Sequence, residues 1–390
     1  MSSISSIKKV LSTDNIVLTL FLVYNMQGIF YESGGVVSQS LIFLVILISF
    51  ISFIKVIVSF SGDKIVSIWA TFIFLNIFYY FISGNWSRSL DVNHLKGILC
   101  GMLPFFIFYD SGRKGKDLSK NFKSFFIIAL IVTIASYYRN KSQFMIEYQT
   151  ENVVNNIAYS FIPLIPFIFL FKGKIILQYG FLLLIAIFII FGSKRGAIVS
   201  GVFSMGCFMY YVYRDTSNKS IYKKILLFAL SLIVVYITYY TFLENNFVLR
   251  RFELVSEGQT SNRDVIYRMI WNYWLNTPSV VNALFGFGFV ASVKITGRYL
   301  AHNDWLEVLS NMGLLGIIFY ALLMYQSYKL KIRFKTSSIW YQMIVTIMIT
   351  WIVMTIFTTR YNGLVSIYSN VLIGYIAGLA YRNKKLSINC

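Results

Sequence analysis

Long uninterrupted runs of apolar residues dominate the chain, and polar residues gather between them. Each run holds roughly 18 to 25 residues, enough for an α-helix to cross a hydrocarbon layer about 30 Å thick. Twelve spans are expected, at residues 15–31, 37–59, 65–83, 95–109, 124–138, 154–171, 175–192, 196–213, 225–243, 304–328, 338–358 and 363–381. The pattern predicts an all-α integral membrane protein whose residues 1–390 form a single polytopic domain.

Composition supports this class. The chain is 57% hydrophobic and 13% charged, whereas soluble proteins average about half and a quarter. Its three cysteines, Cys100, Cys207 and Cys390, show neither a CxxC spacing nor a zinc-like pairing with histidine, so we expect no disulfide framework, no metal site and no cofactor. Lys8 and Lys9 precede the first apolar run without a small-residue cleavage site after it, which indicates a retained first helix.

The distribution of basic residues predicts the orientation. Of 35 Lys and Arg residues, 22 fall in the even-numbered loops and the two terminal segments. Because cytoplasmic loops are the basic ones, both termini are expected in the cytoplasm and the odd loops in the periplasm. The net charge of +20 therefore reflects topology and attraction to anionic lipid rather than nucleic-acid binding.

One connection stands out on the predicted periplasmic side, the loop 244–303 between spans nine and ten. Within it, SNRDVIYRMIWNYWLN (261–276) begins with Ser261 and Asp264 in a capping-box arrangement. Its apolar and aromatic positions predict a short amphipathic helix at the membrane surface, ended by Thr277-Pro278. The following LFGFGF (284–289) predicts tight turns.

Basic residues in this loop are mostly arginines, namely Arg250, Arg251, Arg263, Arg268 and Arg298. The planar guanidinium can bind phosphate oxygens through two parallel hydrogen bonds, which indicates an anionic ligand. Contact with lipid headgroups along an interfacial helix is the alternative. In GSKRGAIVSG (192–201), Lys194 and Arg195 lie between two long apolar runs. Charges at such a depth are usually functional, although Arg195 could also extend towards the interface.

A third polar group opens span ten, in AHNDWLEVLSNMGLLG (301–316). The imidazole of His302 can exchange a proton near neutral pH, or it can simply hydrogen-bond at the interface. Asn303 and Asp304 are expected to cap the helix start. Gly313 and Gly316 are expected to let this span pack closely against a neighbouring helix.

Together these blocks resemble the O-antigen ligase and polymerase superfamily of polytopic membrane glycosyltransferases. The resemblance rests on S-x-R-G at 193–196, on SNRDVIYRMIW, and on HNDWLEVLSNMGLLG after FGFG, and it covers at least residues 190–325. The family more often has serine directly before the first arginine, where Lys194 intervenes here.

The resemblance implies a metal-independent, inverting sugar transfer at the periplasmic face, in a fold similar to that of C-type glycosyltransferases. The donor would be a saccharide on undecaprenyl diphosphate. Arg195 and Arg263 would clamp the diphosphate, and His302 would deprotonate the acceptor hydroxyl. Further substrate contacts are expected from Arg250, Arg251, Arg268, Arg298, Asn303 and Asp304. The rings of Trp271, Trp274 and Trp305 could stack on sugars, but we favour anchoring at the interface.

The acceptor separates two activities that share these motifs. A polymerase would use a repeat unit linked to undecaprenyl diphosphate as acceptor, with a chain-length regulator protein as a candidate partner, whereas a ligase would use lipid A core. We favour the polymerase because YNMQGIFYESGGVVSQS (24–40) resembles polymerase amino ends. A protein-glycosylating ligase, a capsule polysaccharide as product, and a flippase or other transporter with twelve spans remain alternatives.

Overall fold

The computed structural model describes residues 12–31, 34–59, 62–86, 88–149, 153–216, 221–244, 246–256, 263–363 and 365–388. The predicted all-α class is confirmed. The helices are α2 (Thr13–Phe30), α3 (Val36–Val58), α4 (Lys64–Ser83), α5 (Ser89–Met102), α6 (Pro104–Arg113), α7 (Ser119–Tyr148), α8 (Ala158–Phe161), η1 (Ile162–Phe171), α9 (Ile175–Phe191), α10 (Arg195–Thr216), α11 (Ile221–Glu244), α12 (Asn246–Ser256), α13 (Arg263–Leu275), α14 (Val280–Phe285), α15 (Ala291–Thr296), α16 (Asp304–Lys329), η2 (Leu330–Arg333), α17 (Ile339–Phe357) and α18 (Ser366–Ile388).

Helices occupy all twelve predicted ranges, but they differ in length. Within the described residues, eight are long and apolar enough to cross a membrane, which makes this a multi-pass membrane protein. Ala158–Phe171 and Ile175–Phe191 are shorter apolar helices, and α2 and α18 are not among the eight. The predicted span 154–171 is the clearest departure, because Pro163 and Pro166 lack the N–H that an α-helix needs and η1 forms a buried 3-10 helix instead.

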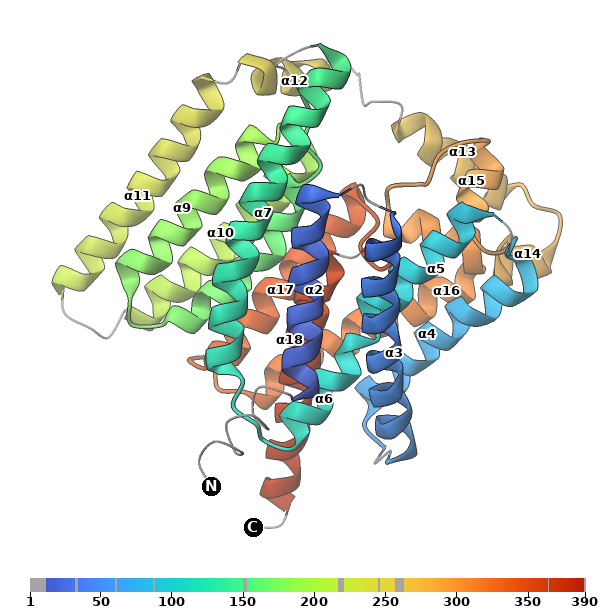
Figure 1. The fold of residues 1–390 in the computed structure, drawn as a ribbon, viewed down its shortest axis with the longest axis horizontal. Helices are drawn as coiled ribbons and strands as arrows, with labels where there is room; N and C mark the ends of the chain where they lie inside the picture. The colour runs from blue at the N-terminus through green and yellow to red at the C-terminus, as the bar shows by residue number, and fades with distance from the viewer. Residues whose placement is uncertain are drawn as a thin grey trace.

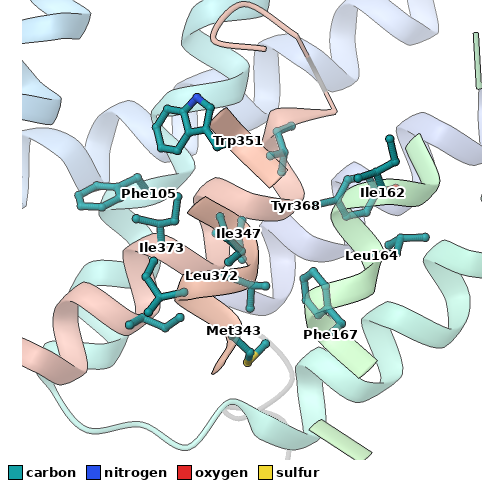
Figure 2. Close-up of a cluster of buried hydrophobic side chains, with 14 of the residues drawn as sticks. Phe105, Ile162, Leu164, Phe167, Met343, Ile347, Trp351, Tyr368, Leu372 and Ile373 are labelled. Carbon is teal, nitrogen blue, oxygen red and sulfur yellow. The ribbon is translucent and has the colours of Figure 1, made fainter. Parts of the chain in front are cut away.

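The centre of the bundle is built by α6, η1, α17 and α18. Their buried side chains meet in one cluster, which includes Phe105, Phe167, Trp351 and Leu372 (Figure 2). Glycines bring α6 and α18 into direct backbone contact, since a Cβ placed on Gly378 would lie 2.2 Å from the carbonyl oxygen of Tyr109. Small residues at a helix interface permit this approach.

Three basic residues at one end of the bundle form ion pairs. α2 begins and α18 ends at one end, whereas α12 and α13 lie at the opposite end (Figure 1). Cations from the predicted cytoplasmic loops have carboxylate partners: Lys55 and Arg113 both contact Asp110, and Lys172 lies 2.6 Å from Asp215. Lys55, Arg113 and Lys172 are thus each paired with a carboxylate.

In its described residues, the predicted long loop 244–303 contains four short helices, α12 to α15. The predicted amphipathic helix is α13, which begins at Arg263. Ser261, the first residue of the expected capping box, lies outside the described residues. Asp264 pairs with Arg268 one turn later, at 3.0 Å. A hydroxyl cap does occur at α14, where the Ser279 oxygen accepts a hydrogen bond from the backbone N–H of Asn282 at 3.2 Å.

The predicted tight turns are present at Gly286 and Gly288, whose φ angles are +81° and +100°. The turn at Gly286 packs against α16 at Gly313, where the helix is kinked and φ is +60°. A Cβ on Gly313 would lie 2.5 Å from the backbone nitrogen of Gly286, so only glycine fits. Close packing at Gly313 is thus real, but the partner is the 284–288 turn and not another span. A Cβ on Gly316 would meet side chains of its own helix, Val308 and Met312.

Candidate active site

The site begins where α9 ends and α10 starts. Gly192 follows α9, Ser193 adopts φ +53°, and Arg195 is the first residue of α10. The Nη1 atom of Arg195 donates a hydrogen bond to the carbonyl oxygen of Arg251, 3.0 Å away. A Cβ on Gly196 would lie 2.3 Å from the Tyr159 hydroxyl and 2.6 Å from the Phe357 Cβ. The glycine of the S-x-R-G block therefore allows these two residues to approach Arg195.

Arg263 connects this region to the end of α17. Its Nη1 atom donates to the carbonyl oxygen of Phe357, the last residue of α17, at 2.8 Å. One turn along α13, the Tyr267 hydroxyl donates to the carbonyl oxygen of Ile356 at 3.0 Å. The final carbonyls of a helix have no partners within it and carry partial negative charge. They hold the guanidinium of Arg263 and dock the first turn of α13.

Arg251 and Lys194 complete what we call the cationic cluster: Lys194, Arg195, Arg251 and Arg263. Burial and the charges of Arg195 and Arg263 lower the pKa of Arg251. Burial and the three arginines lower the pKa of Lys194 to about 8. The Nη1 atom of Arg251 is buried and has no hydrogen-bond partner in the described part of the chain.

The cluster is unlike the basic end of the bundle. Within the described ranges, no carboxylate forms an ion pair with Lys194, Arg251 or Arg263, whereas Lys55, Arg113 and Lys172 at the other end contact Asp110 or Asp215. Four cationic groups that repel one another are held close by backbone contacts. An anion is the chemical species that would relieve this repulsion and occupy the open donors.

His302 lies beside the cluster, in the segment that leads into α16. Its side chain is exposed and its backbone adopts φ +50°, a conformation that non-glycine residues seldom adopt. Desolvation by its neighbours, together with the charges of Arg263 and Lys194, lowers the pKa of His302 below its usual 6.5. The imidazole is therefore neutral near pH 7 and can accept a proton.

Neighbouring residues fix the backbone around His302. The Tyr267 hydroxyl, which donates to Ile356, also lies 3.4 Å from the His302 carbonyl oxygen. Asn303 caps α16, as predicted, by accepting from the backbone N–H of Leu306 at 3.1 Å. The buried carboxylate of Glu307 accepts from the Ala301 N–H at 2.9 Å and from the Ser292 hydroxyl at 2.8 Å. These contacts hold an uncommon conformation in place.

The position of Asp304 corrects the expectation of a substrate contact. Its side chain is fully buried. One oxygen accepts from the backbone N–H of Arg360 at 2.6 Å, and the other accepts from the Tyr320 hydroxyl. Asp304 therefore holds the segment that joins α17 to α18, which begins directly after Phe357, whose carbonyl binds Arg263.

Three of the predicted arginines point elsewhere. Arg268 turns to Asp264 at 3.0 Å, and the guanidinium carbon of Arg298 lies 5.7 Å from the Tyr299 ring centre. Arg250 lines a separate surface cavity beside Glu244. The structure does not bring these three side chains into the cationic cluster.

The tryptophans have internal contacts. The indole N–H of Trp305 donates to the Thr355 hydroxyl at 3.1 Å, so this ring joins α16 to α17 rather than anchoring at an interface. Trp274 donates to the Ala283 carbonyl at 3.1 Å and ties α13 to α14. Trp271 is 47% exposed, which keeps both the anchoring and the stacking expectation open for that ring.

Tyr159, Tyr267, Glu307 and the Phe357 carbonyl belong to this site without having been singled out from the sequence. Tyr267 stands in the quoted SNRDVIYRMIW block, one turn after Arg263. Glu307 is likewise part of the His302 block. Tyr159 and Phe357 carry no local signal, because only the fold brings them to Arg195 and Arg263.

An apolar groove of about 540 Å³ runs down the side of the bundle from the cluster, between α9, α10, α11 and α12. Ile198, one turn after Arg195, and Phe252, next to Arg251, lie at its edge near the cations. Val202 and Val235 continue the apolar lining. The molecule thus presents the cationic cluster and an apolar groove near each other.

Comparison with known proteins agrees with the motif blocks. Residues 180–321 match the family model described as O-antigen ligase. This range runs from α9 into α16 and contains the whole cationic cluster and His302. It confirms the resemblance to the O-antigen polymerase and ligase superfamily. No curated protein matches the chain.

Proposed function

Because residues 180–321 carry the pattern of the O-antigen ligase family, we propose that this multi-pass membrane protein is a glycan polymerase. It transfers a growing saccharide from undecaprenyl diphosphate to a lipid-linked repeat unit at the periplasmic face of the bacterial cytoplasmic membrane, and both its termini are cytoplasmic. The observation that supports this most is the cationic cluster, in which Lys194, Arg251 and Arg263 have no carboxylate partner in the described part of the chain, beside a neutral histidine.

The cluster binds the diphosphate of the donor. Arg195 and Arg263 each donate to a backbone carbonyl, so the two guanidinium groups are already oriented. Arg251 adds a buried Nη1 atom that has no hydrogen-bond partner among the described residues. Negative charge grows on the diphosphate as the glycosidic bond breaks, and donors arranged in advance stabilise that charge most strongly.

His302 acts as the general base. The acceptor hydroxyl gives its proton to the neutral imidazole and its oxygen forms a bond to the anomeric carbon of the donor. The bond from that carbon to the diphosphate oxygen breaks, and the electron pair stays on the undecaprenyl diphosphate. Attack from the face opposite the leaving group inverts the anomeric configuration, and no metal ion is required.

The apolar groove between α9, α10, α11 and α12 holds the polyprenyl chain of the donor. Its edge at Ile198 and Phe252 adjoins the cluster, so one lipid can place its diphosphate on the arginines and its tail in the groove. Burial of an apolar chain there adds affinity in proportion to the area covered.

A ligase that transfers the glycan to lipid A core is the second candidate, favoured by the description of the matching family model. Both reactions need the same cluster and base. The amino-terminal resemblance at residues 24–40, in α2 and the start of α3, supports the polymerase. A flippase is less well supported, because the cationic cluster takes Arg251 from α12 and Arg263 from α13, which lie at one end of the bundle and not at its middle (Figure 1).

The test replaces the gene with His302→Ala in the bacterium that carries it, after membrane insertion of the variant is verified, and resolves the surface glycan by length. A polymerase leaves a single repeat unit on lipid A core. A ligase leaves the core bare while long lipid-linked chains accumulate. Tyr299→Phe, an exposed residue on the same segment, is the control and should retain the normal ladder. A normal ladder from His302→Ala contradicts the proposal.

A further inference from the structure

A second cavity lies beyond the cationic cluster, further along α13. It measures about 560 Å³ and is open to the surface. The second half of α13, the turn after it, α14 and the start of the glycine-rich segment form its walls. The lining residues used below are Asn272, Tyr273, Asn276, Asn282 and Phe287.

Its chemistry differs from that of the cluster. No charged residue lines the cavity. In the part of the chain that the structure describes, no hydrogen bond joins the carboxamide groups of Asn272, Asn276 or Asn282 to another residue. Each carboxamide offers two donors and an acceptor. The rings of Tyr273 and Phe287 add apolar faces, with centroids 4.8 Å apart at an interplanar angle of 69°.

The walls of the cavity are held in place by contacts outside it. Trp274 donates to the Ala283 carbonyl at 3.1 Å, which fixes the angle between α13 and α14. The backbone N–H of Phe287 donates to the Ser310 carbonyl at 2.8 Å, which attaches the glycine-rich segment to α16. The three amides and two rings are therefore presented by a frame that exists before any ligand binds, which lowers the entropy lost on binding.

We propose that this cavity binds sugar rings of the substrate glycan. The inference rests on the proposed function and names a site for it. Uncharged hydrogen-bonding groups interleaved with aromatic faces suit a neutral saccharide, which offers hydroxyl groups and apolar C–H faces. A phospholipid headgroup would require a cation that the lining lacks.

Position along α13 supports the assignment. Arg263 opens the helix at the cluster, and the cavity residues Met269, Asn272 and Tyr273 follow on the same helix. At 1.5 Å per residue they lie about 9 to 15 Å from Arg263 along the helix axis. A glycan attached to a diphosphate on the cluster could therefore reach the cavity with sugars that follow the reacting one.

The experiment uses the full chain purified into nanodiscs and two probes. One is undecaprenyl diphosphate. The other is the oligosaccharide of one to three repeat units, released by mild acid from lipid-linked glycan of the same cells. Binding is measured by calorimetry for the unchanged chain, for the Asn272→Ala/Asn276→Ala double variant, and for Asn383→Ala. Asn383 is an exposed amide at the end of α18 and serves as a matched control.

The double variant should bind the oligosaccharide about tenfold more weakly, as expected for two lost hydrogen bonds. It should bind undecaprenyl diphosphate as the unchanged chain does, and Asn383→Ala should change neither affinity. Equal oligosaccharide affinity in the double variant and the unchanged chain overturns the proposal. If the unchanged chain binds undecaprenyl diphosphate but not the oligosaccharide, this inference alone fails. If it binds neither probe, the proposed function fails as well.

Discussion

Replacing Arg251 with methionine should stabilise the empty protein while it impairs the reaction. The Nη1 atom of Arg251 is buried and has no hydrogen-bond partner in the described residues. A buried donor left without a partner costs about 1–3 kcal/mol, and more when it is charged. The charges of Arg195 and Arg263 add repulsion, which together with burial lowers the pKa of Arg251. This strain is explained if an anion normally occupies the site.

The size of the effect follows from what Arg251→Met removes and what it keeps. The apolar part of the side chain and the backbone carbonyl that binds Arg195 remain. A contact of the guanidinium with the Phe247 ring, 5.8 Å away, is lost, and such contacts contribute about 0.5–1 kcal/mol at exposed sites. The free energy of unfolding should therefore stay equal or rise by up to about 2 kcal/mol. Loss of one preorganised donor should slow transfer by about a hundredfold.

The assay measures thermal unfolding of the purified chain in detergent, with and without undecaprenyl diphosphate, and transfer by membranes that contain equal amounts of each variant. The unchanged chain should gain more stability from the lipid than Arg251→Met does. Arg251→Lys keeps the charge but loses the planar fork, and should recover only part of the transfer rate. A variant that unfolds more easily than the unchanged chain and transfers at the normal rate would show that Arg251 has only a structural role, which refutes the reasoning.

Four further changes test other parts of the site. His302 must be neutral to act as a base, so the transfer rate should fall as the pH drops through the lowered pKa of His302. The charge of Lys194 is one cause of the lowered pKa. Lys194→Gln removes this charge and should therefore move the acidic limb of the pH profile to higher pH. Lys194 itself loses its charge above about pH 8, so affinity for undecaprenyl diphosphate should decline there, and Lys194→Arg should abolish that decline in a pH series of binding measurements. Asp304→Ala removes the acceptor of two buried hydrogen bonds, from the Arg360 backbone N–H and the Tyr320 hydroxyl, and should lower the free energy of unfolding by about 2–3 kcal/mol in a denaturation series, whereas an unchanged value would contradict its positioning role. Gly313→Ala places a Cβ 2.5 Å from a neighbouring backbone nitrogen at φ +60°, so the yield of folded protein in membranes should drop sharply, and normal yield would show that the kink can relax.

The sequence predicted the parts of this fold that depend on local pattern. Apolar runs predict helices in all twelve ranges because a helix in lipid needs little else than length and hydropathy. They do not distinguish a spanning helix from a buried 3-10 segment, and the prolines at Pro163 and Pro166 produced the latter. The glycines at Gly286 and Gly313 predicted close approach, but not which segments approach.

In the site, the residues named from motifs were Arg195, Arg263 and His302, and the structure brings them together. The direction in which each side chain points was harder to predict from the sequence than which residues contribute to the site. Arg250 and Arg251 are adjacent, and successive side chains on a helix point about 100° apart, so the pattern alone did not reveal that Arg251 faces the cluster.

Asp304 illustrates the same limit at a helix start. The sequence pattern of an acidic residue at a helix start is the same whether its carboxylate faces solvent or binds the backbone of a distant segment. The contact with Arg360 joins residues 56 positions apart, and only the folded chain places them together.

The central claim is that the cationic cluster and His302 transfer a glycan from a lipid diphosphate. The most direct measurement supplies purified protein in liposomes with lipid-linked repeat units and a metal chelator, and follows both free undecaprenyl diphosphate and glycan length. The account predicts one released lipid diphosphate for each new glycosidic bond with the unchanged chain, and neither product with His302→Ala. Equal release by the two proteins, or no release by the unchanged chain, would contradict it.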